Sequence, residues 1–490
     1  MGWPADPVIY EINTAVWLEA LARACGRPVT LADVPAVDWD AVCLDGVDAI
    51  WLMGVWARSP AGLDIARDNV DLMGSLRGAL PDLTDADVIG SPYCVRDYAV
   101  EPAFGGPEGL AVARAALASR GKRLILDYVP NHVAPDHGWV VDHPDRFISG
   151  DDADLASDPQ AWLRVGDHVL AHGRDPYFPP WPDVVQLNAF SRGTRQATAD
   201  TLGEIAEQCD GIRCDMAMLM TNNVFAKTWG AYAGSEPVDD FWPTVIAALR
   251  HRHPGTVLIA EAYWDMEWEL QQQGFDFCYD KRLYDRLVES DVEGVRAHLR
   301  ADVTYQSRLL RFLENHDEPR VATRLTPEAE RAAALMIATL PGATLWHEGQ
   351  FEGRRVRPPV FLTRRPDEPI DADLTTWYRR MLATLSAVDL RSGRWRLLDT
   401  GGWPDNDSHR ALLAWSWGEV RDDRHLIVVN ASASPAQGRV ALPWTDLGDR
   451  RCRLVDLMTG LELIRDGSEL LDPGLYVALD GWRFHVLAVD

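Results

Sequence analysis

Short apolar runs alternate with longer stretches of helical character up to residue 349. Runs of this length, bounded by turn residues, are typical of buried strands. The eight runs are VIYEI (8–12), AIWLMG (49–54), RLILDYV (123–129), GIRCDMA (211–217), VLIAEAY (257–263), FDFCYD (275–280), LLRFLENHD (309–317) and ATLWHEG (343–349). Strands that alternate with helices predict a parallel sheet, and eight such units predict a closed (β/α)8 TIM barrel.

The stretch TPEAERAAALMIATLPG, residues 326–342, illustrates how a helix between two runs is delimited. Thr326 is a good cap, Pro327 suits the first helical turn, and Pro341–Gly342 end the helix. The same alternation is also compatible with an open, doubly wound sheet. No glycine-rich dinucleotide loop follows the first run, however, so the barrel is favoured.

Two segments depart from the alternation. Residues 133–188 are rich in Asp, Pro, His and Trp and show little periodicity, which predicts an inserted loop domain. Residues 391–490 contain short runs such as ALLAWSWGE and HLIVVNAS, which predict a C-terminal antiparallel β-sandwich domain. The barrel domain is then formed by residues 1–132 and 189–390.

The composition is that of a globular protein with a strong negative charge. The 490 residues are 47% hydrophobic, and 48 Lys and Arg against 74 Asp and Glu give a formal net charge of −26. Such a field repels phosphate groups, so neither nucleic acid nor a membrane is expected as a partner. Solubility is the simplest meaning of this charge, and the oligomeric state stays open.

The cysteines and the N-terminus bear on the compartment. The seven cysteines are scattered and form no CxxC pair, which indicates free thiols in a reducing environment. The start MGWPADPVIYEIN lacks the basic segment and apolar run of a signal peptide. No apolar stretch approaches the ~18 residues of a membrane span. We therefore expect a cytoplasmic location.

An arginine and an aspartate interrupt the apolar run GIRCDMAM (211–218). Side chains alternate along a strand, so Arg213 and Asp215 point to one side and Cys214 to the other. Buried charges require a partner or a task. We predict that Arg213 and Asp215 face the mouth of the barrel, and that Cys214 packs against the helices.

Other polar side chains gather where predicted strands end. Asp127 lies near the end of the third run and His132 just after it, Glu261 lies near the end of the fifth, and His316 and Asp317 end the seventh. A single acid at a strand end is usually a turn or helix cap, but this accumulation at several strand ends is hard to assign to capping. The carboxyl ends of TIM-barrel strands form the face that carries the active site. The sequence therefore predicts an active site there.

Three carboxyl groups, those of Asp215, Glu261 and Asp317, would converge on this face, where like charges raise at least one pKa. Arg213 is placed to keep Asp215 ionised. Glu261, flanked by alanines and followed by two aromatic residues, has the more apolar setting. We therefore predict a protonated Glu261 beside an ionised Asp215, the pair of states that a glycosidase uses.

Four ordered segments, DYVPNH, GIRCDMAM, AEAYW and ENHDEP, resemble the four signature regions of the α-amylase superfamily, glycoside hydrolase family 13. VIYEI, GSPYCVRDYAVEPAFGG and PGATLWHEGQ are similar to further family segments. The resemblance covers residues 8 to 350, and the insert and the terminal domain fall where the family has its domains B and C. It implies a retaining glycosidase or transglycosylase that acts on α-glucosidic bonds through a covalent glycosyl-enzyme intermediate.

The resemblance also implies a role for each matching residue. Asp215 would be the nucleophile, Glu261 the acid and base, and Asp317 the residue that holds hydroxyls of the distorted sugar. The remaining matches would orient or bind: Arg213 orients Asp215, Asp127 braces Arg213, His132 and His316 donate hydrogen bonds to the sugar, and Tyr93 stacks beneath it.

The chain departs from the family at several positions. Met218 and Leu219 stand where many members have Lys-His, and Cys94 stands where the family has Asp. Gln186 replaces the acid that, in amylases, joins the Asn matching Asn131 in binding a structural calcium. Loss of a carboxylate weakens a site for a hard cation. We therefore expect no required cofactor and do not predict bound calcium.

The segment EGRRVRPPVFLTRRP, residues 352–366, concentrates arginines in an acidic protein. Ion pairs with the acidic surface are the simpler explanation, and recognition of an anionic group on the substrate is the alternative.

Two classes of function stay open. The first is an enzyme that acts on an α-linked oligosaccharide or glucoside, with water or a sugar as the acceptor. The second is a catalytically inactive, amylase-like protein that binds carbohydrate or serves as a scaffold. The presence of all three carboxylates and the arginine favours the enzyme.

Overall fold

The computed structural model describes residues 2–448 and 450–490. Within them, eight parallel strands close in the order β1-β15-β14-β13-β12-β11-β5-β2, which confirms the predicted TIM barrel. The strands are β1 (Val8–Asn13), β2 (Ala49–Met53), β5 (Arg123–Tyr128), β11 (Gly211–Cys214), β12 (Val257–Ala260), β13 (Phe277–Tyr279), β14 (Leu309–Arg311) and β15 (Ala343–His347). Because β1 pairs with both β2 and β15, the alternative of an open sheet is wrong.

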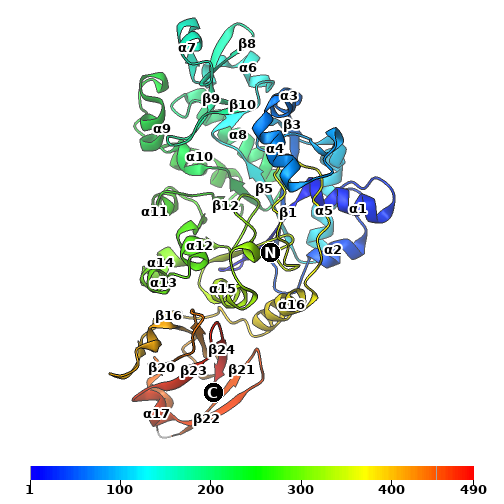
Figure 1. Cartoon of the computed structure of the whole chain (residues 1–490). Coiled ribbons are helices and arrows are strands. Elements are labelled where there is room, and N and C mark those ends of the chain that lie inside the picture. The colour runs from blue at the N-terminus through cyan, green and yellow to red at the C-terminus, as the bar shows by residue number, and fades with distance from the viewer. Residues whose placement is uncertain (1, 449) are drawn as a thin grey trace.

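Helices surround the barrel and connect its strands (Figure 1). They are α1 (Thr14–Cys25), α2 (Ala36–Val42), α3 (Pro60–Asp68), α4 (Val70–Ala79), α5 (Gly106–Ser119), α8 (Arg192–Gln208), α9 (Asn222–Trp229), α10 (Phe241–Arg252), α11 (Glu267–Gln272), α12 (Lys281–Val288), α13 (Val292–Leu299), α14 (Val303–Gln306), α15 (Pro327–Thr339) and α16 (Ala372–Ala387). Thr326 caps α15 as predicted, since its hydroxyl accepts the N–H of Ala329 at 3.3 Å. None of the helices among the described residues is long and apolar enough to cross a membrane.

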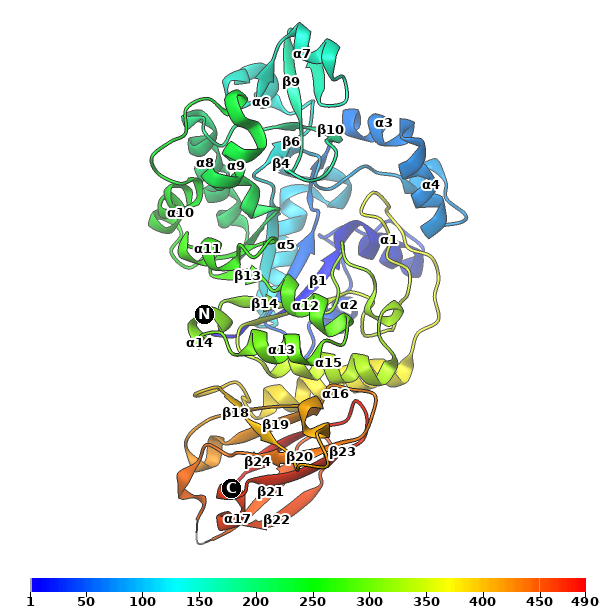
Figure 2. The ribbon, with the colours of Figure 1, turned by 60° about the vertical axis from the view of Figure 1, so that its left-hand side comes forward.

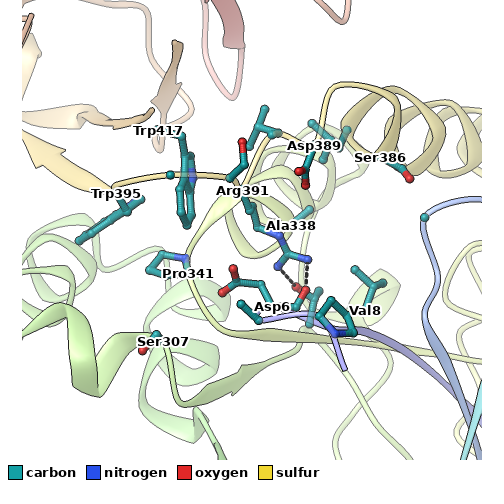
Figure 3. Close-up of a pocket in the computed structure, with 18 of the residues that line it drawn as sticks. Asp6, Val8, Ser307, Ala338, Pro341, Ser386, Asp389, Arg391, Trp395 and Trp417 are labelled. Atoms are coloured by element: carbon teal, nitrogen blue, oxygen red, sulfur yellow. Dashed lines mark hydrogen bonds between the residues drawn. The ribbon is translucent and has the colours of Figure 1, made fainter. Parts of the chain in front are cut away.

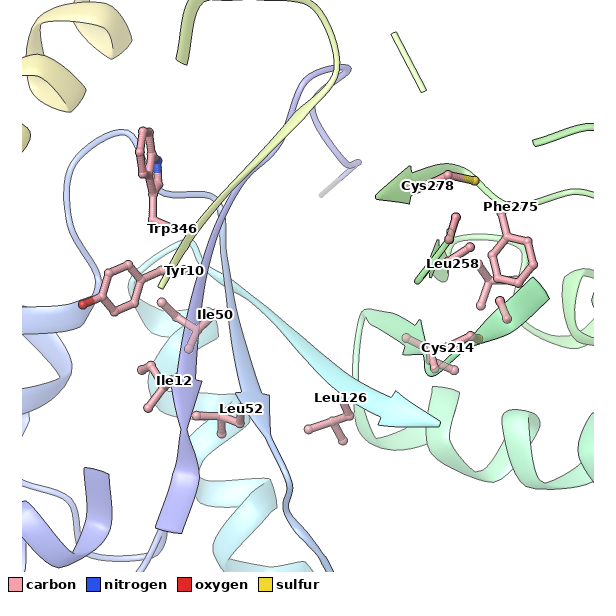
Figure 4. Packing of buried hydrophobic residues seen from close by; sticks show 14 of the residues in the cluster. Tyr10, Ile12, Ile50, Leu52, Leu126, Cys214, Leu258, Phe275, Cys278 and Trp346 are labelled. Atoms are coloured by element: carbon pink, nitrogen blue, oxygen red, sulfur yellow. The ribbon is translucent and has the colours of Figure 1, made fainter. Parts of the chain in front are cut away.

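The barrel strands have two different faces. Outward side chains pack against the helices, and Figure 4 shows Ile12, Leu52, Leu126 and Cys214 in this cluster. Inward side chains form a separate apolar layer that includes Ile9. Strand alternation thus places Cys214 outside and its neighbours inside, as the sequence predicted.

Between β5 and α8 the chain forms a small antiparallel sheet. It contains β6 (His132–Val133), β7 (Ser149–Gly150), β8 (Trp162–Val165), β9 (His168–Gly173) and β10 (Trp181–Gln186), with α6 (Gly138–Asp142) and α7 (Asp152–Ser157) alongside. These elements fall in the expected insert, residues 133–188, apart from His132 at its edge. A two-stranded ribbon of β3 (Trp56–Arg58) and β4 (Val95–Val100) lies before β5 in the chain.

The C-terminal segment folds into two antiparallel sheets, of six strands (β16, β18, β19, β24, β21, β22) and of three (β17, β20, β23). The strands are β16 (Arg396–Leu398), β17 (Thr400–Gly401), β18 (Leu412–Trp417), β19 (His425–Asn430), β20 (Ala436–Val440), β21 (Arg451–Asp456), β22 (Glu462–Asp466), β23 (Leu475–Leu479) and β24 (Phe484–Val489), and α17 (Gly467–Leu471) precedes β23. The indoles of Trp415 and Trp417 donate to the carbonyl of Thr339 at 3.1 and 2.8 Å, which joins this domain to α15. The insert and the C-terminal domain lie at opposite ends of the barrel (Figures 1 and 2).

Candidate active site

Arg213 is the centre of the charged cluster at the carboxyl ends of the strands. Its side chain is fully buried on β11, and its Nη1 donates to Asp215 Oδ1 at 2.7 Å. Its Nη2 lies 2.8 Å from Glu261 Oε2, and Nη1 lies 3.7 Å from Asp127 Oδ1. One guanidinium therefore contacts three carboxylates that come from three neighbouring strands.

Glu261 follows β12 directly and receives hydrogen bonds on both oxygens. Its Oε2 accepts a hydrogen bond from the backbone N–H of Met216 at 2.6 Å and forms the ion pair with Arg213. Its Oε1 lies 3.0 Å from the hydroxyl of Tyr263. A hydroxyl can accept as well as donate, whereas an N–H only donates. When Glu261 is protonated, the proton therefore sits on Oε1.

Asp317 lies at the rim of the site, and 46% of its side-chain surface is exposed. Its Oδ2 is 3.0 Å from His316 Nε2, and that nitrogen is also 2.8 Å from the hydroxyl of Tyr93. The rings of Tyr93 and His316 stack with centroids 5.4 Å apart. Tyr93 also lies under the guanidinium of Arg213, 5.3 Å from its ring centroid.

Asp127 and His132 complete the cluster behind these groups. Asp127 Oδ2 accepts from the indole of Trp51 at 3.2 Å and from the N–H of Gly54 at 3.1 Å, so this carboxylate is fixed from β2. His132 packs against the backbone of Tyr93, and burial lowers its pKa to about 4. The structure thus places all eight candidate residues in one connected group.

Burial and neighbouring charges shift the pKa values of the three carboxyl groups in different directions. Burial raises the pKa of Glu261 to about 7, although Arg213 opposes the shift. Burial also raises the pKa of Asp215, although Arg213 opposes the shift through its charge and its hydrogen bond, so the ionised state of Asp215 stays a prediction. For Asp317, loss of hydration is outweighed by His316 and by two arginines, and its pKa falls below the usual range. Burial is the stronger influence on both carboxyl groups nearest Arg213.

An open pocket of about 460 Å³ adjoins Glu261 on the side of Tyr263 and Met216. Aromatic rings of Phe178, Tyr263 and Trp264 line it, and Tyr177 packs against Trp264 at 4.9 Å. Its charged lining is mainly acidic: Asp175, Asp265, Glu267, Asp285 and Glu318 against Lys281 and Arg282. Met218 and Leu219, by contrast, are buried in the core, so they do not contribute to this side of the site.

Gln186 lies beside Asn131, at the position where the resembled family has an acidic residue. Its Nε2 lies within hydrogen-bond distance of three oxygens: Asn131 O (2.9 Å), Asn131 Oδ1 (2.8 Å) and Leu187 O (2.9 Å). These are the kind of oxygens that a calcium ion would take as ligands. Across the described part of the chain, no group of three or more His, Cys, Asp or Glu side chains is arranged to hold a metal ion.

The arginine run is largely engaged within the protein. Arg364 pairs with Asp82 and Asp87, and Arg365 Nη1 lies 2.6 Å from Glu348 Oε1. Arg357 is the member that reaches the site, where it donates to the backbone carbonyl of Asp317. This supports the simpler explanation for Arg364 and Arg365, whereas Arg357 holds the loop that carries Asp317.

A cavity of about 1060 Å³ lies away from this cluster, between the amino ends of the strands and the C-terminal domain (Figure 3). Arg391 spans it and donates to the carbonyls of Gly342 at 3.0 Å and Asp6 at 2.5 Å. Its guanidinium therefore ties the N-terminal segment to the entry of β15, and we interpret the cavity as a gap between domains.

Two residues of the site were missed in the sequence. Glu11 on β1 is fully buried, and its Oε1 accepts a hydrogen bond from His316 Nδ1. Tyr263 contacts Glu261 as described above. The argument that singled out Arg213, a charge inside an apolar run, applies equally to Glu11 in VIYEI. No local pattern indicates the role of Tyr263.

The chain has known relatives in sequence, although no family model matches it. The α-amylase MalA of Haloarcula japonica is 26% identical over 369 residues, which cover 73% of this chain and 45% of that protein. The intracellular maltogenic amylase of Bacillus subtilis is 24% identical over 251 residues, 50% of this chain and 40% of that protein. The matched segment therefore spans less than half the length of each relative.

Solved structures resemble the whole chain. The α-amylase of Geobacillus thermoleovorans, determined in complex with acarbose, has a TM-score of 0.69 at 17% identity. The likeness covers 100% of this chain and 99% of that one. At this level of identity it establishes the fold, a TIM barrel with a C-terminal β-domain.

Proposed function

Because the homologues and structural neighbours of this chain are α-amylases and maltogenic amylases of the α-amylase superfamily, glycoside hydrolase family 13, we propose that it is a retaining enzyme acting on α-glucosidic bonds. Its substrates are α-glucans, oligosaccharides or small α-glucosides. It transfers the glucosyl group to water or to a sugar through a covalent intermediate.

One observation carries this proposal: Arg213 contacts Asp215 through one terminal nitrogen and Glu261 through the other. Carboxyl groups that share a guanidinium are only a few ångströms apart. Retaining glycosidases need a separation of ~5–5.5 Å, whereas inverting enzymes need ~6.5–9.5 Å to admit a water between the groups. The shared arginine supports the retaining arrangement.

In the first step Asp215 attacks the anomeric carbon. Oδ1 is held by Arg213, so Oδ2 forms the new bond to carbon. The bond between this carbon and the leaving oxygen breaks, and Glu261 gives the proton on Oε1 to that oxygen. Asp317 and His316 bind hydroxyls of the reacting sugar, where its ring distorts towards an oxocarbenium ion.

In the second step Glu261, now ionised, takes a proton from water or from a sugar hydroxyl. The oxygen of this acceptor attacks the anomeric carbon, and the bond to Asp215 breaks. Two inversions at the same carbon retain its configuration. Arg213 stabilises the negative charge that returns to Asp215 when this bond breaks. The same guanidinium also contacts Glu261, so both steps use one fixed cation.

The leaving group occupies the pocket beside Tyr263, because Oε1 of Glu261 faces that side. Trp264 and Phe178 offer aromatic faces on which sugar rings stack. The excess of carboxylates repels phosphate. These features support a neutral, hydroxyl-rich leaving group, and they count against an anionic one.

A catalytically inactive carbohydrate-binding or scaffold protein is the alternative. Such a protein has no need of a buried Glu261, whose pKa burial raises to about 7, next to a carboxylate fixed by arginine, and both features are costly to fold. They favour the enzyme.

We also propose that the enzyme needs no cofactor and works in the cytoplasm. The Gln186 amide satisfies the oxygens that calcium would bind, which supports the first point. All seven cysteines are free thiols, and one relative is named an intracellular enzyme, which supports the second.

Turnover of neutral maltooligosaccharides, an aryl α-glucoside and α-glucosyl phosphate tests the function. We expect α-configured products from the neutral donors and little reaction with the phosphate. Trp264→Ala should raise KM for maltooligosaccharides, whereas Trp268→Ala, an exposed tryptophan on α11, should not. Products of inverted configuration, or no turnover of any donor, would contradict the proposal.

A further inference from the structure

His316 lies between two carboxylates that come from distant parts of the chain. Its Nδ1 faces Glu11 Oε1 on β1, and its Nε2 faces Asp317 Oδ2 at 3.0 Å. A carboxylate oxygen accepts hydrogen bonds and does not donate them when it is ionised. The Tyr93 hydroxyl, 2.8 Å from Nε2, can accept from this nitrogen as well as donate to it, so it is compatible with a proton on Nε2. Contacts with a carboxylate at each ring nitrogen therefore favour an imidazolium cation.

Glu11 is suited to fix this state because it is sealed from solvent. It is 0% exposed, and its other oxygen, Oε2, has no hydrogen-bond partner within the part of the chain that the structure describes. In the sheet register, Glu11 is paired with His347 on β15 and with Trp51 on β2. An ionised carboxylate in such a place needs a cation, and His316 is the group it contacts.

The surroundings of His316 hold its ring in one orientation. Tyr93 stacks on one face, and Trp51 meets the ring at 5.5 Å with an 80° angle between planes. The titratable groups that face the imidazole are Glu11 from β1, Asp127 from β5, Tyr93 from the segment before β4, and Asp317 from its own loop. Two of these acids contact His316 directly, and they raise its pKa well above the ordinary value although burial lowers it.

We infer that Glu11 is a positioning residue that keeps His316 doubly protonated, so that a cation stays beside Asp317 and the reacting sugar throughout the working pH range. The inference rests on the proposed function for its consequence, but the protonation state itself does not depend on turnover. Neutral His132, also in the site, has no such carboxylate partner among the groups that shift its pKa. The two histidines thus differ in charge because only one of them meets a buried acid on β1.

Nitrogen NMR of histidine side chains tests the inference directly. His316 is assigned by the loss of its signals in His316→Gln. In the unmodified enzyme both ring nitrogens should stay protonated from about pH 5 to 9, far above the ordinary pKa of about 6.5. In Glu11→Gln, which keeps size and removes charge, His316 should titrate within that range. A wild-type His316 that titrates near its ordinary pKa would overturn the inference, even if Glu11→Gln failed to fold.

Activity provides the second readout. The ratio of wild-type to Glu11→Gln kcat/KM should be small at about pH 5 and grow by up to about tenfold per pH unit above the pKa of the freed imidazole. Glu330→Gln is the matched control, because Glu330 is a buried acid bonded to Tyr378 at 2.9 Å between α15 and α16. It should give a ratio that does not change with pH. A constant ratio for Glu11→Gln would reduce Glu11 to a structural role.

Discussion

The side-chain amide of Gln186 lies within hydrogen-bond distance of both oxygens of Asn131, its carbonyl at 2.9 Å and Oδ1 at 2.8 Å. In amylases of the resembled family an acid stands at this position and a calcium ion is bound. Here a neutral N–H group meets the oxygens that the ion would otherwise neutralise. The insert is thereby fastened to the end of β5 through hydrogen bonds.

From this contact we predict that chelation leaves the enzyme intact. Treatment with EDTA should not change kcat/KM and should shift Tm by less than about 2 °C, which for a protein of this size corresponds to less than about 2 kcal/mol. Differential scanning calorimetry with and without added calcium measures the effect. Gln186→Glu is the informative variant: a carboxylate facing carbonyl oxygens should lower Tm, and calcium should restore it. A large, calcium-reversible loss in the unmodified enzyme would contradict the prediction.

The nucleophile can be identified by trapping. A fluorinated α-glycosyl donor should label the peptide that contains Asp215, because Oδ2 is free to attack while Arg213 holds Oδ1. Asp215→Asn should lose about 10⁴-fold or more in kcat and should not be labelled. Mass spectrometry of the digest locates the label. Label on Glu261 or Asp317 would refute the assignment.

The acid is identified by its dependence on the leaving group. General acid catalysis contributes about 10²–10⁴-fold where the leaving oxygen needs a proton. Glu261→Gln should therefore cripple turnover of natural glucosides by that factor and spare the first step with a glycosyl fluoride. Added azide should accelerate the second step and give an α-glycosyl azide, because azide needs no base. Equal losses with both donors and no effect of azide would exclude Glu261 as the acid and base.

The pH profile follows from the raised pKa of Glu261, about 7. The reaction needs the protonated form, so kcat/KM should fall as pH rises through about 7. The raised pKa also affects the free energy of unfolding, because the folded state binds this proton more tightly than the unfolded chain, whose glutamates titrate near about 4.3. The stabilisation that the proton provides is therefore lost as pH rises through the folded pKa. The difference in Tm between Glu261→Gln and the wild type should therefore be more positive at about pH 8 than at about pH 5. A kcat/KM that stays level to about pH 9 would show that the acid is not this carboxyl.

The sequence by itself determined where the strands lie and which acids end them. Apolar runs and turn residues are local signals, so β1, β11 and β15 appear where VIYEI, GIRCDMA and ATLWHEG predicted them. The alternation along one strand was enough to turn Arg213 inward and Cys214 outward. β11 and β12 are nevertheless shorter than their runs, because Asp215 and Glu261 lie one residue beyond the strand ends, where the backbone turns into the site.

Tertiary structure alone decided how these groups interact. Glu11 and His316 are 305 residues apart in the chain, and only closure of the barrel between β1 and its neighbours brings them together. Arg213 was expected to serve Asp215, but its second nitrogen also contacts Glu261. The raised pKa of Asp215 follows from burial, which depends on everything packed around the site rather than on adjacent residues. The positions of the strands and the direction of their side chains follow from the periodicity of the sequence. The charge states of the site are set by contacts and burial that exist only once the chain has folded.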